Sequence, residues 1–380
     1  MQVFTYRYSK KSQWDKEPDA SLDSDSTLLL FFGSAHSEDV ESTLHSLSKN
    51  FPLSLKMGCS TAGEIYEDAI YEHGISLAII KFDKTKIKVA SELLSNNGED
   101  GVHCGERVAN ALNADGLRSI FVLSDGIDVN GSELVAAISS QIDDSVILTG
   151  GLGGDDDRFE KTWTWKDGEM LSGCITAVGF YGESINIEHG SRGGWDVLGT
   201  NREVTKSKDN VLYELDGQPA LALYKKYLGD RADGLPGTGL LFPLAIKNDE
   251  EIDGYTVRTI LGINEEEDSI TFAGNIPEGV FVRLMSANFD RLIDGAADAA
   301  GDININEYSR GSIMNIAISC VGRRLILGQR AEEEIEVVAN ELPEQVKQIG
   351  FYSYGEISPL SSGRCDLHNQ TMTLTTFWED

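Results

Sequence analysis

Hydrophobic and polar positions along the chain predict a repeated order of elements: a strand, an amphipathic helix, a second strand and a glycine-rich turn. The turns lie at residues 58–64, 150–156 and 350–356. The elements before them lie at residues 27–33, 38–49 and 55–59 in the first copy, at 119–124, 133–141 and 146–149 in the second, and at 312–320 and 332–342 in the third. An order that recurs three times indicates a duplicated scaffold.

Each turn ends in an acid six residues after a glycine, and these acids are Glu64, Asp156 and Glu356. Glycine permits positive φ and the close approach of another chain or a ligand. A carboxylate at the end of such a turn can orient a ligand or join two repeats, so all three acids are candidate ligand-binding residues. No nucleophile with a neighbouring base accompanies the turns, which favours a binding or sensing scaffold over a catalyst.

Alternating hydrophobic residues after each turn predict β-hairpins, with strands at residues 75–82 and 86–94, at 162–165 and 171–181, and at 371–377. We therefore expect a mixed α/β fold of two similar layered halves, with mixed sheets, helices and hairpins built on the repeat. The pattern changes between residues 200 and 220, where Pro219 stands in the first turn of a predicted helix. This change predicts two domains, residues 1–215 and 216–380, that pack closely because no linker-like segment separates them.

The charge of the chain limits its partners. It has 380 residues with 62 acidic and 32 basic side chains, a net charge of −30. A phosphate-binding surface needs a basic field, so we expect neither nucleic acid nor an anionic membrane as a partner. The first residues lack the apolar run of a secretion signal, and five scattered cysteines without a Cys-x-x-Cys pair suggest no disulfide framework. A cytoplasmic protein is expected.

The densest group of polar residues lies in the last third of the chain. Arg323 follows a strand whose hydrophobic residues indicate that it is buried. Glu356 ends the third turn, and His368 and Asn369 open the final strand. Strand ends of this kind converge on one edge of an α/β sheet, where ligands bind, and Arg323 could hold a carboxylate or phosphate there. Neighbouring candidates for the same site are Cys320, Tyr352 and Gly355. An equally weighted alternative is structural: an ion pair between Arg323 and Glu356, with His368 and Asn369 bonded to turn carbonyls.

Histidine and cysteine provide two further hypotheses. No closely spaced histidine pair is present, which disfavours a zinc enzyme. A single histidine can hold haem iron axially, and His189 and His368 are the candidates because both stand at predicted strand ends. A hydrolase would use Cys59, Ser60 or Cys320, but Ser60 lacks the Gly-x-Ser-x-Gly pattern and buried cysteine is the default reading.

Several motifs together resemble the FIST sensory family. They are MGCSTAGEI at residues 57–65, residues 149–156, YELDGQPALALY at 213–224, IGFYSYGEISP at 349–359 and LHNQTM at 367–372. The resemblance covers residues 25 to 377, with an N-terminal and a C-terminal FIST segment in that order.

The resemblance implies signal input without catalysis. It suggests a sensor for a small ligand, either haem b with nitric oxide or an amino-acid-like metabolite. It also implies regulation of a separate signalling enzyme, a histidine kinase or a cyclic-di-GMP enzyme, because no such output motif is found in the sequence. The hydrolase using Cys59, Ser60 or Cys320 is the alternative, and a Soret absorbance band would distinguish haem from both other readings.

Overall fold

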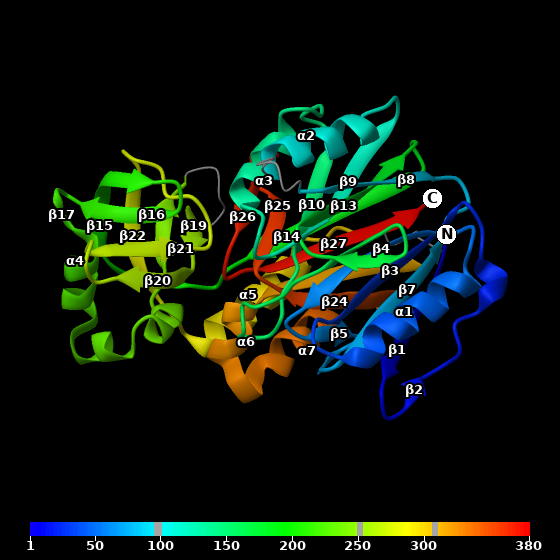
Figure 1. Cartoon of the computed structure of the whole chain (residues 1–380), viewed down its shortest axis with the longest axis horizontal. Coiled ribbons are helices and arrows are strands. Elements are labelled where there is room, and N and C mark those ends of the chain that lie inside the picture. Colours follow the sequence, from blue (N-terminus) through cyan, green and yellow to red (C-terminus); the bar gives the residue numbers. More distant parts are fainter. Residues whose placement is uncertain (95–100, 249–253, 306–310) are drawn as a thin grey trace.

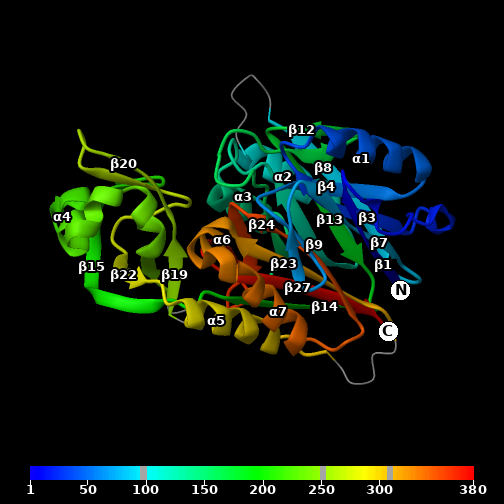
Figure 2. The same ribbon diagram turned by 90° about the horizontal axis from the view of Figure 1, so that it is seen from below.

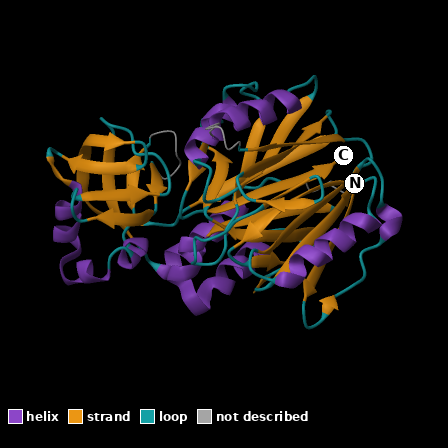
Figure 3. Cartoon of the chain, in the orientation of Figure 1, coloured by secondary structure: helices purple, strands orange, loops and turns teal. Residues whose placement is uncertain are grey.

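The computed structural model describes residues 1–94, 101–248, 254–305 and 311–380. It shows a large body and a smaller β-rich unit formed by residues 196–286, which we call the insert (Figure 1). Strands make up the interior of the body and helices cover its outside (Figure 3). The two termini lie together at the end of the body farthest from the insert (Figures 1 and 2).

The body contains the predicted repeat three times, and in each copy two parallel strands are joined through a helix and followed by antiparallel strands. The first copy has the strand order β4-β3-β7-β1, the second β10-β9-β13-β8 and the third β24-β23-β27-β14. The first comprises β1 (Gln2–Ser9), β3 (Thr27–Ser34), α1 (Glu38–Asn50), β4 (Leu55–Thr61) and β7 (Gly74–Lys81), with the short β2 (Gln13–Trp14) and η1 (Ala20–Leu22).

The second and third copies each have an additional helix before their central strand. The second comprises β8 (Lys86–Leu93), α2 (Gly101–Leu112), β9 (Leu117–Ser124), α3 (Gly131–Ser139), β10 (Ile147–Leu152) and β13 (Cys174–Tyr181). The third comprises β14 (Ile185–Arg192), α5 (Phe289–Gly301), β23 (Ile313–Cys320), α6 (Val321–Leu327), η4 (Gly328–Arg330), α7 (Ala331–Glu341), β24 (Val346–Ser353) and β27 (Met372–Glu379). The mixed α/β class predicted from the sequence is confirmed.

Each copy sends the hairpin after its glycine-rich turn to the sheet of another copy. The first hairpin, β5 (Glu64–Tyr66) and β6 (Ala69–Tyr71), pairs with β24 of the third copy. The second, β11 (Thr164–Lys166) and β12 (Glu169–Leu171), pairs with β4 of the first. The third, β25 (Gly355–Pro359) and β26 (Cys365–His368), pairs with β10 of the second. The exchange is therefore cyclic and joins the three copies into one body.

One glycine in each copy makes this arrangement possible. Gly58, Gly150 and Gly350 occupy the same register position, opposite Phe31, Val122 and Ala317. A Cβ atom on them would lie 2.3, 1.9 and 1.8 Å from the carbonyl oxygens of those partners. No side chain fits at such distances, so the glycines are required by close packing of the parallel strands.

Asp156, the acid of the second turn, does not occupy the position that Glu64 and Glu356 have in the other two copies. Glu64 and Glu356 each lie in the first strand of an exchanged hairpin, but the residue in their register position in the second copy is Thr164. Thr164 comes fourteen residues after Gly150, whereas Glu64 comes six residues after Gly58. The second turn is longer, and Asp156 lies within that longer loop.

The insert interrupts the third copy between β14 and α5. Its strands form one sheet in the order β19-β18-β22-β15-β16-β21-β20 over a separate core that includes Leu212, Leu221 and Phe272. The strands are β15 (Asp196–Lys208), β16 (Val211–Leu215), β17 (Gln218–Pro219), β18 (Leu244–Lys247), β19 (Tyr255–Arg258), β20 (Ile260–Asn264), β21 (Ser269–Phe272) and β22 (Phe281–Ser286), and the helices are α4 (Ala220–Leu228), η2 (Gly229–Gly234) and η3 (Gly237–Leu241). The boundary expected at residue 215 lies inside the insert, at the end of β16, and stays a prediction. Among the described residues, no helix is both long and apolar enough to cross a membrane.

Candidate functional site

The turn at residues 368–371, between β26 and β27, lies where the insert meets the body. The Trp195 indole Nε1 donates to the Gln370 carbonyl at 3.0 Å, and Arg258 of the insert donates to the Leu367 carbonyl at 2.8 Å. The backbone N–H of Thr259 approaches the Asn369 Oδ1 at 3.4 Å. Two contacts from the insert and one from Trp195, the residue directly before it, therefore meet at or beside this turn.

Glu356 holds the turn from the side of the body. It is completely buried, and its carboxylate accepts hydrogen bonds from the Ser353 hydroxyl and from the backbone N–H and hydroxyl of Thr371. Burial raises the pKa of Glu356 to about 7, although these hydrogen bonds oppose the rise. Glu64 has the same position in the first copy, accepts from the Gly74 N–H, and has a pKa raised well above its usual value by burial.

Arg323 joins the same turn to the two segments that connect the insert to the body. Its guanidinium donates to the carbonyls of Gly193 at 2.6 Å, Leu292 at 2.6 Å and Gln370 at 3.3 Å. Gly193 leads into the insert and Leu292 follows it on α5. The fourth contact is an ion pair with Glu334 at 2.9 Å. The expected pairing with Glu356 was therefore wrong, because Glu334 of α7 occupies the position beside the guanidinium.

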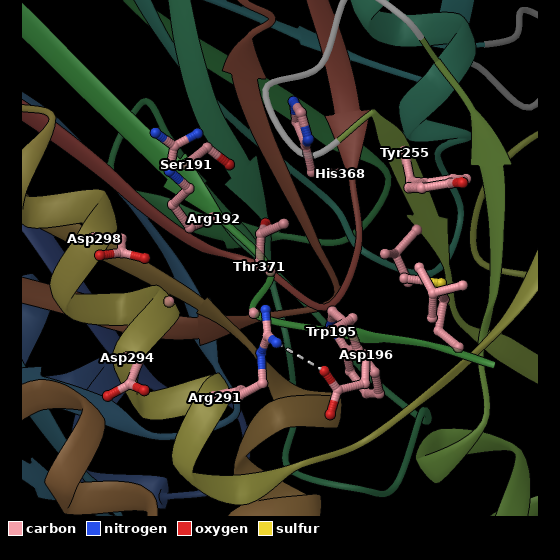
Figure 4. Close-up of a pocket in the computed structure, with 16 residues that line it drawn as sticks. Ser191, Arg192, Trp195, Asp196, Tyr255, Arg291, Asp294, Asp298, His368 and Thr371 are labelled. Carbon is pink, nitrogen blue, oxygen red and sulfur yellow. Dashed lines mark ion pairs between the residues drawn. The ribbon is translucent and has the colours of Figure 1, made fainter.

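A cavity of about 620 Å³ opens at this junction, and we call it the hinge cavity (Figure 4). Its wall is formed by the chain leading into the insert, by β19, by α5 and by the turn, with Trp195, Tyr255, Met285, Arg291, His368 and Thr371 among the lining residues. Both connections between insert and body thus border the cavity.

The charges of the hinge cavity are mostly carried by α5 and by the start of the insert. Arg291 pairs with Asp196 at 3.1 Å, and Arg192 pairs with Asp302 at 2.7 Å. Asp294 and Asp298 lie one turn apart on α5, and within the described residues neither makes an ion pair or side-chain hydrogen bond. The cavity therefore has two carboxylates available to a ligand.

A second cavity, of about 530 Å³, is lined by Cys320 and Thr259, which both bond to the turn, and we call it the apolar cavity. It is formed by η3 and β20 of the insert and by α6 and the loop before β11 of the body. Most of its lining is hydrophobic, including Leu240, Ile260, Leu261, Val321 and Leu325. The two cavities share no lining residue.

Comparison with known proteins identifies the family. The model of the FIST N domain matches residues 27–218, and that of the FIST C domain matches residues 220–359. The chain belongs to the FIST family. FIST domains are sensory domains of signal transduction. An uncharacterized protein of Methanocaldococcus jannaschii, MJ1623, is 24% identical over 369 residues, which cover 87% of this chain and 69% of that protein.

The FIST chain brings some of the predicted site residues together and leaves others apart. His368 lines the hinge cavity and Cys320 lines the apolar cavity, while Arg323, Glu356 and Asn369 support the 368–371 turn. The other four candidates line neither cavity. The Tyr352 hydroxyl donates to Glu334, and Gly355 packs against Leu152 and Leu367. Glu64 lies in the hairpin of β5 and β6, and Asp156 lies 3.8 Å from Arg324. A ligand-binding role for these residues stays a prediction.

The two histidines proposed for haem do not form a haem site with the residues around them. The Nε2 of His368 donates to the Ser358 carbonyl at 3.0 Å, and the hinge cavity beside it is lined by charged side chains. His189 lies on β14 beside Thr375 and lines neither cavity, and burial lowers its pKa. No described histidine lines the apolar cavity. The residues around His189 and His368 therefore do not fit haem, and a haemin titration tests this directly.

The nucleophiles of the hydrolase alternative are buried in this FIST protein. Cys59 and Ser60 have no exposed surface, and the Ser60 hydroxyl accepts from the Trp163 N–H at 3.0 Å. Burial raises the pKa of both the Cys59 and the Cys320 thiol well above the usual value. Because the thiolate is the reactive form, these environments disfavour nucleophilic attack.

Four residues of these sites were missed by sequence reasoning. Asp155, which is buried, organises the loop after β10, and the indole of Trp195 bonds to the 368–371 turn. Asp294 and Asp298 border the hinge cavity. The spacing of these two acids by four residues on a predicted helix places them on one face, so it could have indicated a paired site.

Proposed function

We propose that this FIST protein is a sensor whose small ligand binds in the hinge cavity and carries an ammonium group. The observation that carries the proposal is the position of the cavity, between insert and body and beside both chain connections of the insert. A ligand that contacts both units stabilises the relative orientation in which those contacts form.

The charges support an amine or an amino-acid-like molecule as the ligand. Asp294 and Asp298 offer carboxylates without a partner among the described side chains, and Arg291 stands one turn before Asp294 on the same helix. An ammonium can bind between the two aspartates, and a ligand carboxylate can reach Arg291 by displacing Asp196. Trp195 and Tyr255 provide apolar surface for the rest of the molecule.

The geometry also supports a way for the ligand to change the protein. A Cβ atom on Gly194 would lie 2.0 Å from the Arg291 carbonyl oxygen, so the segment entering the insert packs directly on the first turn of α5. A ligand that moves α5 or Trp195 would therefore move the insert as well. We propose that a separate signalling enzyme, a histidine kinase or a cyclic-di-GMP enzyme, reads the orientation of the insert.

Thermal unfolding with defined probes tests the ligand class. Lysine, arginine, glutamate and putrescine are amine probes, and succinate is a probe that lacks an amine. We expect at least one amine, and not succinate, to raise the melting temperature of the parent and of the control variant Asp115→Asn/Asp144→Asn. These two control aspartates are exposed, lie on the second copy and line neither cavity.

The variant Asp294→Asn/Asp298→Asn should lose this shift and keep its unliganded melting temperature, because both residues are exposed. An equal shift in the cavity variant and the control, or no amine-specific shift in the parent, would overturn the proposed ligand class.

A further inference from the structure

The apolar cavity has an aromatic wall made by Phe159 and Tyr354. Their rings are stacked, with centroids 4.3 Å apart and planes 17° from parallel. Tyr354 is buried, whereas 46% of Phe159 is exposed. Both residues line the cavity. A large exposed aromatic side chain therefore stands at the mouth of an apolar space.

Phe159 is held in that place at a conformational cost. Its φ is 54°, in the left-handed region that bulky residues avoid. Such a conformation is strained and persists only where the surroundings impose it. Burial of Phe159 offsets only part of this cost, because 46% of the residue is in contact with solvent.

Asp155 is the residue that imposes the conformation. Its buried carboxylate accepts the backbone N–H groups of Phe159 at 2.8 Å, Glu160 at 2.9 Å and Lys161 at 2.7 Å. The same carboxylate accepts the Tyr354 hydroxyl. Burial alone would raise the pKa of Asp155, but these hydrogen bonds and one from His36 lower it overall. One ionised carboxylate thus fixes both members of the aromatic pair.

The opposite wall is aliphatic and the rim is apolar. Leu261 and Leu325 line the cavity with 45% and 43% of their surfaces exposed. The lining contains one charged side chain, that of Asp157, and no lysine or arginine. A flat apolar molecule would cover these exposed groups, and an anionic one would be repelled by Asp157 and by the net charge of −30.

We propose that the apolar cavity is a second ligand site, for a planar aromatic molecule that is uncharged or cationic. The ligand stacks on the Phe159–Tyr354 pair and packs against the aliphatic residues of β20 and α6. Because β20 belongs to the insert and α6 to the body, this ligand also contacts both units. The site is independent of the hinge cavity and of the proposed function.

Titration with the neutral aromatic dye N-phenyl-1-naphthylamine tests the site. We expect saturable fluorescence enhancement at one site in the parent, with affinity about tenfold weaker in Phe159→Ala, equivalent to about 1.4 kcal/mol. Leu325→Gln at the rim, which is exposed and not expected to affect folding, should also weaken binding. The matched control is Phe281→Ala, an exposed phenylalanine of β22 that lines neither cavity.

The variant Asp294→Asn/Asp298→Asn should bind the dye like the parent, which separates this site from the hinge cavity. Two results would overturn the proposal: dye binding that does not saturate, or equal affinities of Phe159→Ala, Leu325→Gln and Phe281→Ala while thermal melts show all three folded.

Discussion

Arg323 and Glu334 form an ion pair in which neither side chain has exposed surface, with the Arg323 Nε 2.9 Å from a Glu334 carboxylate oxygen. The other Glu334 oxygen accepts the hydroxyls of Ser319 at 3.0 Å and Tyr352 at 2.8 Å. The remaining guanidinium nitrogens of Arg323 hold backbone carbonyls on both connections of the insert. Arg323 is thus a positioning residue that joins insert and body behind the wall of the hinge cavity.

Replacing Arg323 should destabilise the protein more than any surface ion pair does. We expect Arg323→Met to lower the free energy of unfolding by about 3–5 kcal/mol, because it leaves the Glu334 charge buried without its partner. The double variant Arg323→Met/Glu334→Gln should recover part of this loss. Chemical denaturation measures both values. Arg330→Gln, which breaks the exposed pairs with Glu333 and Asp290, is the control and should lower the stability far less.

The same variant decides between the two roles expected for Arg323. If Arg323→Met kept its stability and lost amine binding in the thermal assay, Arg323 would contact the ligand directly. Loss of stability together with binding would agree with the positioning role.

Stability should depend on pH through Glu356. Burial raises its pKa from the ordinary 4.5 of a glutamate to about 7, so the folded state binds an additional proton between these values. Stability therefore falls as pH rises from about 4.5 through 7, and the raised pKa corresponds to about 3 kcal/mol.

The variant Glu356→Gln isolates this contribution, because its side chain does not titrate and can still bond to Ser353 and Thr371. We expect the stability of the parent, relative to the variant, to fall between pH 4.5 and 7.5 when measured by denaturant unfolding. A constant difference between the two across this range would show that Glu356 titrates normally.

The three register glycines should be equally intolerant of a side chain. Gly58→Ala, Gly150→Ala and Gly350→Ala each place a methyl group against a carbonyl oxygen of the neighbouring strand, so we expect losses of at least about 3 kcal/mol or failure to fold. Gly262→Ala is the control, because its Cβ would meet no atom within 4 Å. Tolerance at one of the three positions, seen in thermal melts, would mean that this copy does not need close strand packing.

Haemin should not bind through a histidine of this chain. We expect titration of the protein with haemin to give no saturable Soret shift, since no described histidine lines the apolar cavity and His368 is bonded to Ser358. The parent is compared with His189→Ala, His368→Ala and the control His36→Ala. A Soret shift abolished by one of the first two replacements, and kept in the control, would restore haem as the ligand.

The local order of elements was determined by the sequence, because hydrophobic spacing distinguishes a strand from an amphipathic helix over a few residues. For this reason the first strand and the following helix of each copy lie where the pattern predicts them, within about two residues. Gly58, Gly150 and Gly350 were also visible, since glycine at one position in three copies indicates a shared backbone requirement.

Only the tertiary structure decided which segments meet. Any edge strand can satisfy the backbone hydrogen bonds of a hairpin, so the cyclic exchange of β5, β11 and β25 cannot be read from local spacing. The choice of Glu334 over Glu356 as the partner of Arg323 depends on how α7 packs against β23 and β24. In that position Glu334 also accepts the hydroxyls of Ser319 on β23 and Tyr352 on β24. The two cavities exist because residues 196–286 fold as a separate unit against the body. A hydrophobic pattern indicates that a residue is buried, but it does not indicate which other segment packs against that residue.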